Sequence, residues 1–186
     1  MSAGKLFVIS GASGVGKSTV LSRVMAKRKD LLFSVSATTR SPRPGEQEGV
    51  SYYFLSKEKF QQMIRQGAFL EYDEHNATFY GTPREQLEEK LTRANVVLDV
   101  EPNGAFAVRE KRPDATLIFI MPPSEEELAR RLTGRNDTPP EQIRMRLDRA
   151  AWEMAQRTAY DYVVVNDQVD RCAEEILQII AQKADE

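Results

Sequence analysis

Residues 11–18 are the part of the chain whose types and spacing most directly indicate chemistry. They read Gly-Ala-Ser-Gly-Val-Gly-Lys-Ser, which matches the pattern G-x-x-x-x-G-K-[ST] at every fixed position. Glycines at this spacing let main-chain N–H groups converge on phosphate oxygens, and a helix that follows adds the positive end of its dipole. We therefore predict a phosphate loop, in which Lys17 contacts the β- and γ-phosphates of a nucleotide and Ser18 ligates Mg²⁺.

The sequence on either side supports this interpretation over a plain glycine-rich turn. An apolar run at residues 6–9 predicts a buried strand before the loop, and residues 18–29 have helical periodicity after it. The motif requires both elements. The predicted ATP-binding residues of this region are Gly11, Ala12, Ser13, Gly14, Val15, Gly16, Lys17, Ser18 and Thr19.

Asp99 is a second candidate for the metal side of such a site. It follows the apolar residues 96–98 and so ends a predicted strand. Open α/β sheets bind ligands at the carboxyl ends of their strands, and a carboxylate there suits a Mg²⁺–nucleotide complex. The alternative is that Asp99 caps a helix predicted from residue 103, although Asn103 is closer to that start.

Arg40 and Arg43 could bind a different phosphate. They lie three residues apart around Pro42, whose fixed φ restricts the chain between them. Two guanidinium groups held in this way can each bind a phosphate with paired hydrogen bonds. From these residues alone, an ordinary solvated turn with two surface arginines explains the pattern equally well.

Short apolar runs alternate with helical segments along most of the chain, which is typical of α/β proteins. Strands are predicted at residues 6–9, 96–100, 116–120 and 162–165, and helices at 18–29, 84–94, 103–111, 124–133, 139–157 and 169–182. Residues 34–83 differ, with polar strand-like pieces at 34–36, 51–54 and 69–72 and one short helix near 56–66. We therefore expect a parallel sheet flanked by helices, with a small mixed α+β insert.

The composition excludes several classes of protein. Among 186 residues, 41% are hydrophobic and 29% are charged, a globular balance, and the net charge of −2 does not favour a nucleic-acid polymer as partner. The single Cys172 excludes a disulfide framework, and the longest apolar run, residues 117–121, is too short for a membrane helix. We expect a soluble, cytoplasmic protein without a membrane partner.

The sequence resembles the guanylate kinase family. The similarity is carried by Ser-x-Thr-Thr-Arg-x-Pro-Arg-x-Gly-Glu at residues 36–46 and Gly-x-x-Tyr-x-Phe at 49–54. It continues through residues 69–71, 80–82, 122–124, 131–135, 146–147 and 165–167, and so spans nearly the whole chain. The resemblance implies a P-loop kinase core, a GMP-binding insert and a helical lid.

The resemblance also implies roles for individual residues. The residues expected to bind GMP are Ser36, Arg40, Arg43, Tyr52, Glu71, Tyr80, Gly81, Thr82 and Glu101. Among them, Glu71 would accept hydrogen bonds from N1 and N2 of guanine, a pair of donors that adenine lacks. Asn166 would join the ATP site. Glu101 stands where the family commonly has Asp and is one methylene longer, so its contact to GMP is expected to shift.

The expected activity is transfer of the γ-phosphoryl group of ATP, with Mg²⁺, to GMP and also to dGMP. The residues expected to act on the transferring phosphates are Lys17, Arg40, Arg43, Arg131, Arg135 and Arg146. The expected parts are a core at residues 1–33, 84–124 and 151–186, a GMP-binding insert at 34–83 and a lid at 125–150. The protein would act as a monomer or homo-oligomer on these small molecules.

Two alternative functions remain open at this point. One is a non-catalytic guanylate-kinase-like module that binds phosphorylated peptides, and the other is a P-loop kinase for another small phosphate. The complete phosphate loop argues against the module, and Glu71 with residues 80–82 argues against the other kinase.

Overall fold

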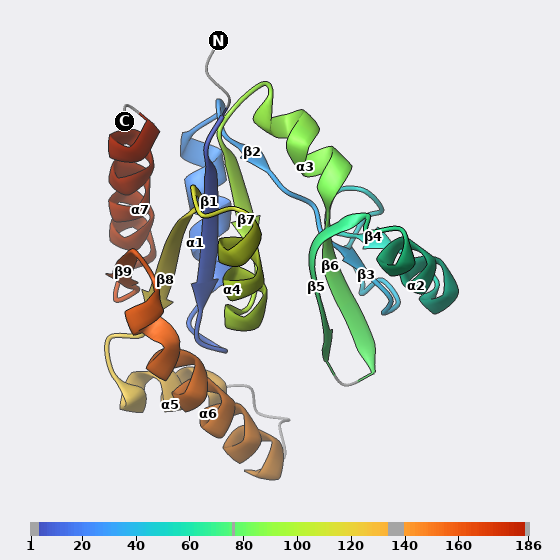
Figure 1. Ribbon diagram of the computed structural model, residues 1–186. Helices are drawn as coiled ribbons and strands as arrows, with labels where there is room; N and C mark the ends of the chain where they lie inside the picture. Colours follow the sequence, from blue (N-terminus) through green and yellow to red (C-terminus); the bar gives the residue numbers. More distant parts are fainter. Residues whose placement is uncertain (1–3, 76, 134–139, 185–186) are drawn as a thin grey trace. The chain divides into compact units, whose positions relative to one another are not determined.

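The computed structural model describes residues 4–75, 77–133 and 140–184 (Figure 1). The chain divides into two compact units. The first unit comprises Met1–Leu6 and Asp30–Ala115, and the second unit comprises Phe7–Lys29 and Thr116–Glu186. No helix in the described part of the chain is long and apolar enough to cross a membrane.

The second unit holds the predicted phosphate loop and combines parallel strands with helices. They are β1 (Leu6–Gly11, of which Leu6 falls in the first unit), α1 (Lys17–Lys27), β8 (Thr116–Met121), α5 (Glu125–Thr133), α6 (Pro140–Ala155), the 3₁₀ helix η1 (Gln156–Ala159), β9 (Tyr162–Val165) and α7 (Val169–Ala184). Strand β8 pairs in parallel with both β1 and β9, with Val8 opposite Leu117 and Ile118 opposite Tyr162.

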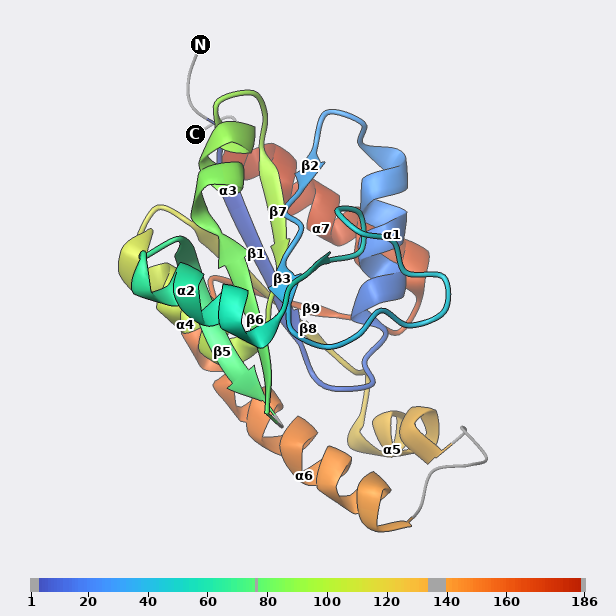
Figure 2. The ribbon, with the colours of Figure 1, turned by 90° about the vertical axis from the view of Figure 1, so that its right-hand side faces the viewer.

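Burial explains why β1 and β8 are almost continuously apolar. All six residues of β1 are buried, as are Thr116 to Ile120 of β8. Strands buried on both faces lack the alternation of half-exposed strands. Helices α1 and α7 lie side by side (Figure 2), and each buries one apolar stripe, Val20, Leu21 and Val24 in α1. This packing holds the end of β1 and the start of α1 in place.

The first unit combines a parallel strand pair with a separate mixed sheet. Its elements are β2 (Leu32–Phe33), β3 (Ala37–Thr38), β4 (Tyr53–Phe54), α2 (Lys57–Arg65), β5 (Phe69–His75), β6 (Thr78–Pro83), α3 (Arg84–Leu91), β7 (Val96–Asp99) and α4 (Pro102–Lys111). Strands β2 and β7 are parallel, whereas the mixed sheet has the order β4-β3-β6-β5. In that sheet β6 runs antiparallel to both of its neighbours.

An aromatic cluster forms the core of the mixed sheet. Phe60 of α2 stacks on Phe69 at 4.3 Å and on Phe79 at 5.3 Å between ring centroids. Ser56 starts α2 by accepting a hydrogen bond from the Lys59 N–H at 3.1 Å, an ordinary N-cap that shields the first turn. The helix therefore anchors β5 and β6, the two strands that carry predicted GMP-binding residues.

The α/β class expected from the sequence is confirmed, but several boundaries are wrong. Residues 34–36 are not a strand, because the chain changes partners there. The Ser34 N–H donates to Val97 in β7, while the Ser36 carbonyl accepts from Tyr53 in β4. Strand β6 was not expected at all. Helix α4 begins at Pro102 rather than at residue 103, since proline is favourable in the first helical turn.

Candidate functional site

The phosphate loop joins β1 to α1, as its motif requires. Gly14 and Gly16 have φ angles of 85° and 90°, in the left-handed region that favours glycine. Gly16 is also the N-cap of α1, so no capping side chain covers the first turn of that helix. Lys17, Ser18 and Thr19 form this turn, and Ser18 and Thr19 are exposed. The positive end of the α1 dipole therefore coincides with the loop.

Helix α5 packs directly against the loop at Gly14. A Cβ at this position would lie 2.5 Å from Cδ2 of Leu132, which is itself buried. Leu128, one turn earlier in α5, is buried as well. Gly14 is thus required by backbone conformation and by the close approach of α5, and not by flexibility.

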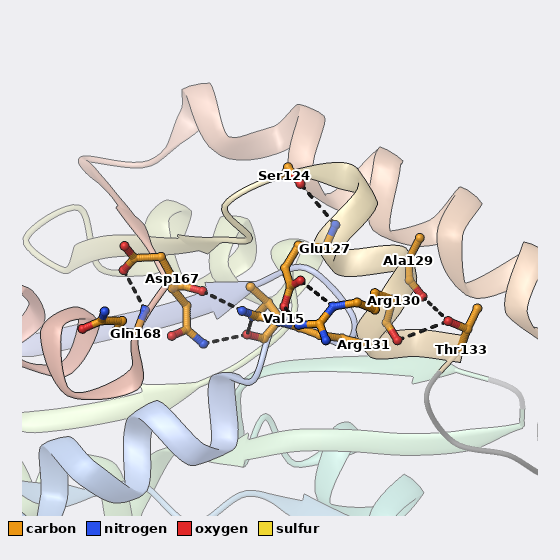
Figure 3. Close-up of polar contacts among 10 residues, drawn as sticks. Val15, Ser124, Glu127, Ala129, Arg130, Arg131, Thr133, Asp167 and Gln168 are labelled. Carbon is orange, nitrogen blue, oxygen red and sulfur yellow. Dashed lines mark hydrogen bonds and ion pairs between the residues drawn. The ribbon is translucent and has the colours of Figure 1, made fainter.

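Two side chains hold the Val15 carbonyl from elements distant in sequence (Figure 3). Arg131 donates to it at 3.1 Å and the Asn166 amide donates at 2.8 Å. Arg131 also donates to the Asn166 carbonyl at 3.1 Å and pairs with Glu127 at 2.8 Å. Hydrogen bonds from Arg130 and Arg131 lower the pKa of Glu127 to about 2. Arg131 and Asn166, both predicted site residues, therefore contact the phosphate loop through its main chain.

Glu153 is a loop contact that the sequence did not indicate. Its side chain is buried, and one carboxylate oxygen accepts a hydrogen bond from the Ser13 N–H at 2.6 Å. Its other oxygen accepts from Arg149 at 3.0 Å. The one hint in the sequence is that this acidic residue stands between two apolar ones, Ala150 and Met154. The structure shows that both of them are buried.

In the first unit, Arg40 is held by a carboxylate. Its two terminal nitrogens donate to the two oxygens of Glu46 at 2.6 and 2.7 Å, a bidentate pair. Glu46 also accepts from the Arg43 N–H at 2.8 Å. The hydrogen bonds from Arg40 and Arg43 lower the pKa of Glu46 to about 2. The hydrogen bond to Glu46 in turn raises the pKa of Arg40. The sequence alone indicated no role for Glu46.

Aromatic rings complete the surroundings of Arg40. Its guanidinium lies 5.0 Å from the ring centroid of Tyr52, and the Tyr52 and Tyr80 rings meet edge-on at 6.1 Å. The structure thus brings Arg40, Tyr52 and Tyr80 together. The Arg43 side chain is exposed, and only its main chain joins this cluster through Glu46.

Glu71 lies in the most enclosed part of the predicted GMP site. It is 4% exposed, and Thr82 donates its hydroxyl to Oε1 at 2.5 Å. Burial raises the pKa of Glu71. A Cβ on Gly104 would lie 3.0 Å from Oε2 of Glu71, so α4 approaches this carboxylate closely. The sequence gave no sign of this contact.

Gly81 and Ser36 complete the predicted residues of the mixed-sheet region. Gly81 pairs with Ala37 in the sheet, and a Cβ on it would lie 3.0 Å from both Phe60 and Phe69. The aromatic core therefore excludes a larger residue there. Ser36 is half-buried, and its carbonyl accepts from Tyr53 at 2.9 Å.

The remaining predicted residues lie at the ends of elements. Asp99 ends β7 and is half-buried, while the exposed Glu101 is the N-cap of α4. Arg146 is half-buried on α6. Arg135 lies outside the described residues. Each unit therefore contains groups suited to phosphate: main-chain N–H groups in the second unit, and arginine and tyrosine side chains in the first.

Comparison with known proteins gives consistent matches along the chain. A family model described as guanylate kinase matches residues 3–183. Guanylate kinase from Thermus thermophilus is 47% identical over 178 residues, which are 95% of this chain and 80% of that protein. Guanylate kinase from Rubrobacter xylanophilus is 46% identical over 181 residues, 97% of this chain and 95% of that protein. The crystal structure of guanylate kinase from Anaplasma phagocytophilum matches with a TM-score of 0.81 and 36% identity, covering 98% of this chain and 87% of that chain.

Proposed function

The chain belongs to the guanylate kinase family, and from that membership we propose that it transfers the γ-phosphoryl group of ATP to GMP, giving ADP and GDP. The observation that carries this proposal is the presence in one chain of a complete phosphate loop and a buried carboxylate, Glu71, that is already bonded to Thr82. The loop supports binding of a nucleotide triphosphate, and the carboxylate supports selection of guanine. Neither feature alone distinguishes this reaction from those of other kinases.

The ATP phosphates are proposed to bind at residues 11–19 through main-chain N–H groups other than that of Ser13, which already donates to Glu153. Lys17 supplies the cation, and the positive φ angles of Gly14 and Gly16 turn the loop backbone. Asn166 supports the loop through the Val15 carbonyl at 2.8 Å. Since these groups are held by packing before a ligand arrives, little reorganisation is needed on binding.

GMP is proposed to bind in the first unit. Its phosphate would be bound by Arg40, Arg43, Tyr52 and Tyr80. Its base would be bound by Ser36, Glu71, Gly81 and Thr82. Glu101, two residues after Asp99, would also contact GMP. A carboxylate accepts from N1 and N2 of guanine, whereas adenine would leave it without these donors. A buried polar group that loses its partner is costly, so adenine is discriminated against strongly.

Mg²⁺ is proposed to accompany ATP. Ser18 and Asp99 offer oxygen atoms, the donors that this ion prefers, and neither is fully buried. Across residues 4–75, 77–133 and 140–184, no group of three acidic, histidine or cysteine residues could hold a metal ion. We propose that Ser18 and Asp99 assist in binding the ion, directly or through water, together with oxygens of the ATP phosphates. When bound, the ion would neutralise charge on the phosphates.

The reaction itself makes modest demands on the protein. An oxygen of the GMP phosphate, already anionic near neutral pH, forms a bond to the γ-phosphorus while the bond from that atom to ADP breaks. No general base is required. The residues must align two anions and offset their repulsion, and we assign this to Lys17, Arg40, Arg43, Arg131, Arg135 and Arg146.

We also propose that three parts of the chain move relative to one another. They are the core (residues 1–33, 84–124 and 151–186), the GMP-binding insert (34–83) and the lid (125–150). The contacts of Leu132 with Gly14 and of Arg131 with Val15 support the assignment, since they give the lid helix α5 a direct contact with the phosphate loop. Closure of such a lid would exclude water, which would otherwise accept the phosphoryl group. The cytoplasm is the proposed compartment.

A coupled assay with ATP, Mg²⁺ and a panel of acceptors tests the proposal. We expect turnover with GMP and dGMP, and at most weak turnover with AMP, CMP and ribose phosphates. Activity confined to another acceptor would assign the chain to a different small-phosphate kinase. Binding of phosphorylated peptides without any turnover would indicate the interaction module.

A further inference from the structure

Glu153 is a buried carboxylate for which the proposed reaction has no role so far. It is 2% exposed and lies near the end of α6, about 140 positions from the phosphate loop in sequence. Both of its oxygens are used: Oε2 accepts from the Ser13 N–H at 2.6 Å and Oε1 accepts from Arg149 Nε at 3.0 Å. A side chain of α6 therefore bonds directly to the loop main chain.

The position of Ser13 within the loop gives this contact its importance. Ser13 directly precedes Gly14, which adopts a φ of 85°. Such a backbone has few side-chain contacts of its own to fix the orientation of its peptide groups. A charged acceptor at short distance fixes the direction of the Ser13 N–H, and so the plane of the peptide that enters the glycine turn.

The hydrogen bonds that α5 and α6 make to the loop involve side chains of opposite charge. Glu153, an anion from α6, takes the Ser13 N–H, whereas Arg131, a cation from α5, takes the Val15 carbonyl at 3.1 Å. The two bonds hold donor and acceptor groups on either side of Gly14. A carboxylate near a triphosphate would ordinarily repel it, and the ion pair with Arg149 offsets this charge.

We propose that Glu153 is a positioning residue, which holds the Ser13 peptide so that the loop is ready to receive the phosphates of ATP. The inference rests on the proposed function, because it assigns ATP to this loop. Glu153 does not touch the reacting atoms and acts only through Ser13. Its removal should therefore weaken the use of ATP and leave the affinity for GMP unchanged.

The test compares Glu153→Ala, which removes the acceptor, with Glu153→Gln, which keeps an acceptor oxygen and removes the charge. Steady-state kinetics should show the KM for ATP rising about tenfold in the Ala variant and about threefold or less in the Gln variant. The KM for GMP should stay within twofold in both. If Glu153→Ala does not fold, Glu153→Asp replaces it, since it withdraws the carboxylate by one methylene and should also raise the KM for ATP.

Two control variants separate positioning from a general loss of stability. Ile176→Val removes a methyl group from a fully buried side chain of α7, and should lower Tm without changing either KM. Glu174→Ala breaks an exposed ion pair with Lys27 in the same unit and should change neither KM. Any of three results would overturn the inference. The KM for ATP could be unchanged in Glu153→Ala, the KM values for ATP and GMP could rise equally, or the KM for ATP could be as high in Glu153→Gln as in Glu153→Ala.

Calorimetric titration with a non-hydrolysable ATP analogue distinguishes this inference from the proposed reaction. The wild-type protein should bind the analogue without GMP, and Glu153→Ala should bind it about tenfold more weakly. If the wild type binds the analogue but does not phosphorylate GMP, the proposed reaction fails while the role of Glu153 is still tested. Equal affinity in both proteins contradicts the role of Glu153 whatever the acceptor.

Discussion

The two units offer phosphate-binding groups of different kinds. In the second unit the candidate groups are main-chain N–H groups of the loop. Helix α5 packs on Gly14, Glu153 of α6 accepts from Ser13, and Asn166 after β9 donates to the Val15 carbonyl. In the first unit the candidate groups are side chains, and Arg40 is held by Glu46 and by the Tyr52 ring. One region is therefore prepared by packing, and the other by a network of ion pairs.

The difference has a consequence for ligand binding. Main-chain N–H groups in the loop keep their protons at any pH near neutrality, so the anion binding proposed for them should not change with pH there. The two terminal nitrogens of Arg40 are already paired with Glu46, a carboxylate whose pKa is lowered to about 2. A phosphate bound there, as we propose, would have to share Arg40 with Glu46 or displace it, and binding would then depend strongly on the shape and charge of the ligand.

The largest effect is expected from Lys17→Met. Removing the cation of the loop should lower kcat/KM by about 10³-fold, since a preorganised charge aimed at the transferring phosphates is lost. A coupled assay measures this. The matched control is Lys27→Met at the other end of the same helix, where an exposed pair with Glu174 is removed and activity should stay within about twofold. A fall in kcat/KM smaller than that of Glu71→Gln, described next, would mean that the main-chain groups of the loop can act on the phosphates without Lys17.

Glu71→Gln should produce the next largest effect, confined to the acceptor. The amide cannot accept from both guanine donors and keep the Thr82 hydrogen bond in the same geometry, so kcat/KM for GMP should fall about 100-fold. The ratio of GMP to AMP turnover should fall with it. Glu74→Gln on the same strand is the control, because Glu74 is exposed. An unchanged ratio would show that guanine is selected elsewhere.

A smaller effect is expected from Gly104→Ala. The new methyl group would lie 3.0 Å from Oε2 of Glu71 and displace that carboxylate slightly, raising the KM for GMP about fivefold, or about 1 kcal/mol. Alanine favours a helix over glycine by about 1 kcal/mol, which offsets the crowding at Glu71, so Tm should change little. Glu110→Ala, exposed in the same helix, should leave the KM for GMP unchanged. A raised KM for ATP instead would contradict the assignment of α4 to the acceptor side.

The smallest effect concerns the stability of the Arg40 pair. The pKa of Glu46 is lowered from 4.5 to about 2, so its contribution to stability is complete above about pH 5 and is lost as the pH falls toward 2. Glu46→Gln should therefore be slightly less stable than wild type at pH 7, with the difference shrinking between pH 5 and pH 2. Urea unfolding at several pH values measures this. A difference that grows on acidification would contradict the pair.

The sequence predicted the second unit better than the first. The apolar runs of β1 and β8 and the loop motif are local patterns, and each appears where it was expected. The mixed sheet was predicted poorly because β3 and β4 have two residues each and β6 has polar positions. Such short strands are defined by their hydrogen-bonding partners, and Ser34 and Ser36 show how the partner can change within three residues.

The residue types at the candidate site were readable from the chain alone. Lys17 and Arg40 belong to contiguous motifs whose chemistry depends on spacing over a few residues, and Glu71 was indicated by the resemblance to the guanylate kinase family. Their neighbours were not readable: Glu153 meets Ser13 across about 140 residues, and Gly104 meets Glu71 from a different element. Contacts of this kind depend on which helix packs against which loop. Local periodicity carries no information on that packing, so the fold alone reveals which groups contact the phosphate loop and the carboxylate proposed to bind guanine.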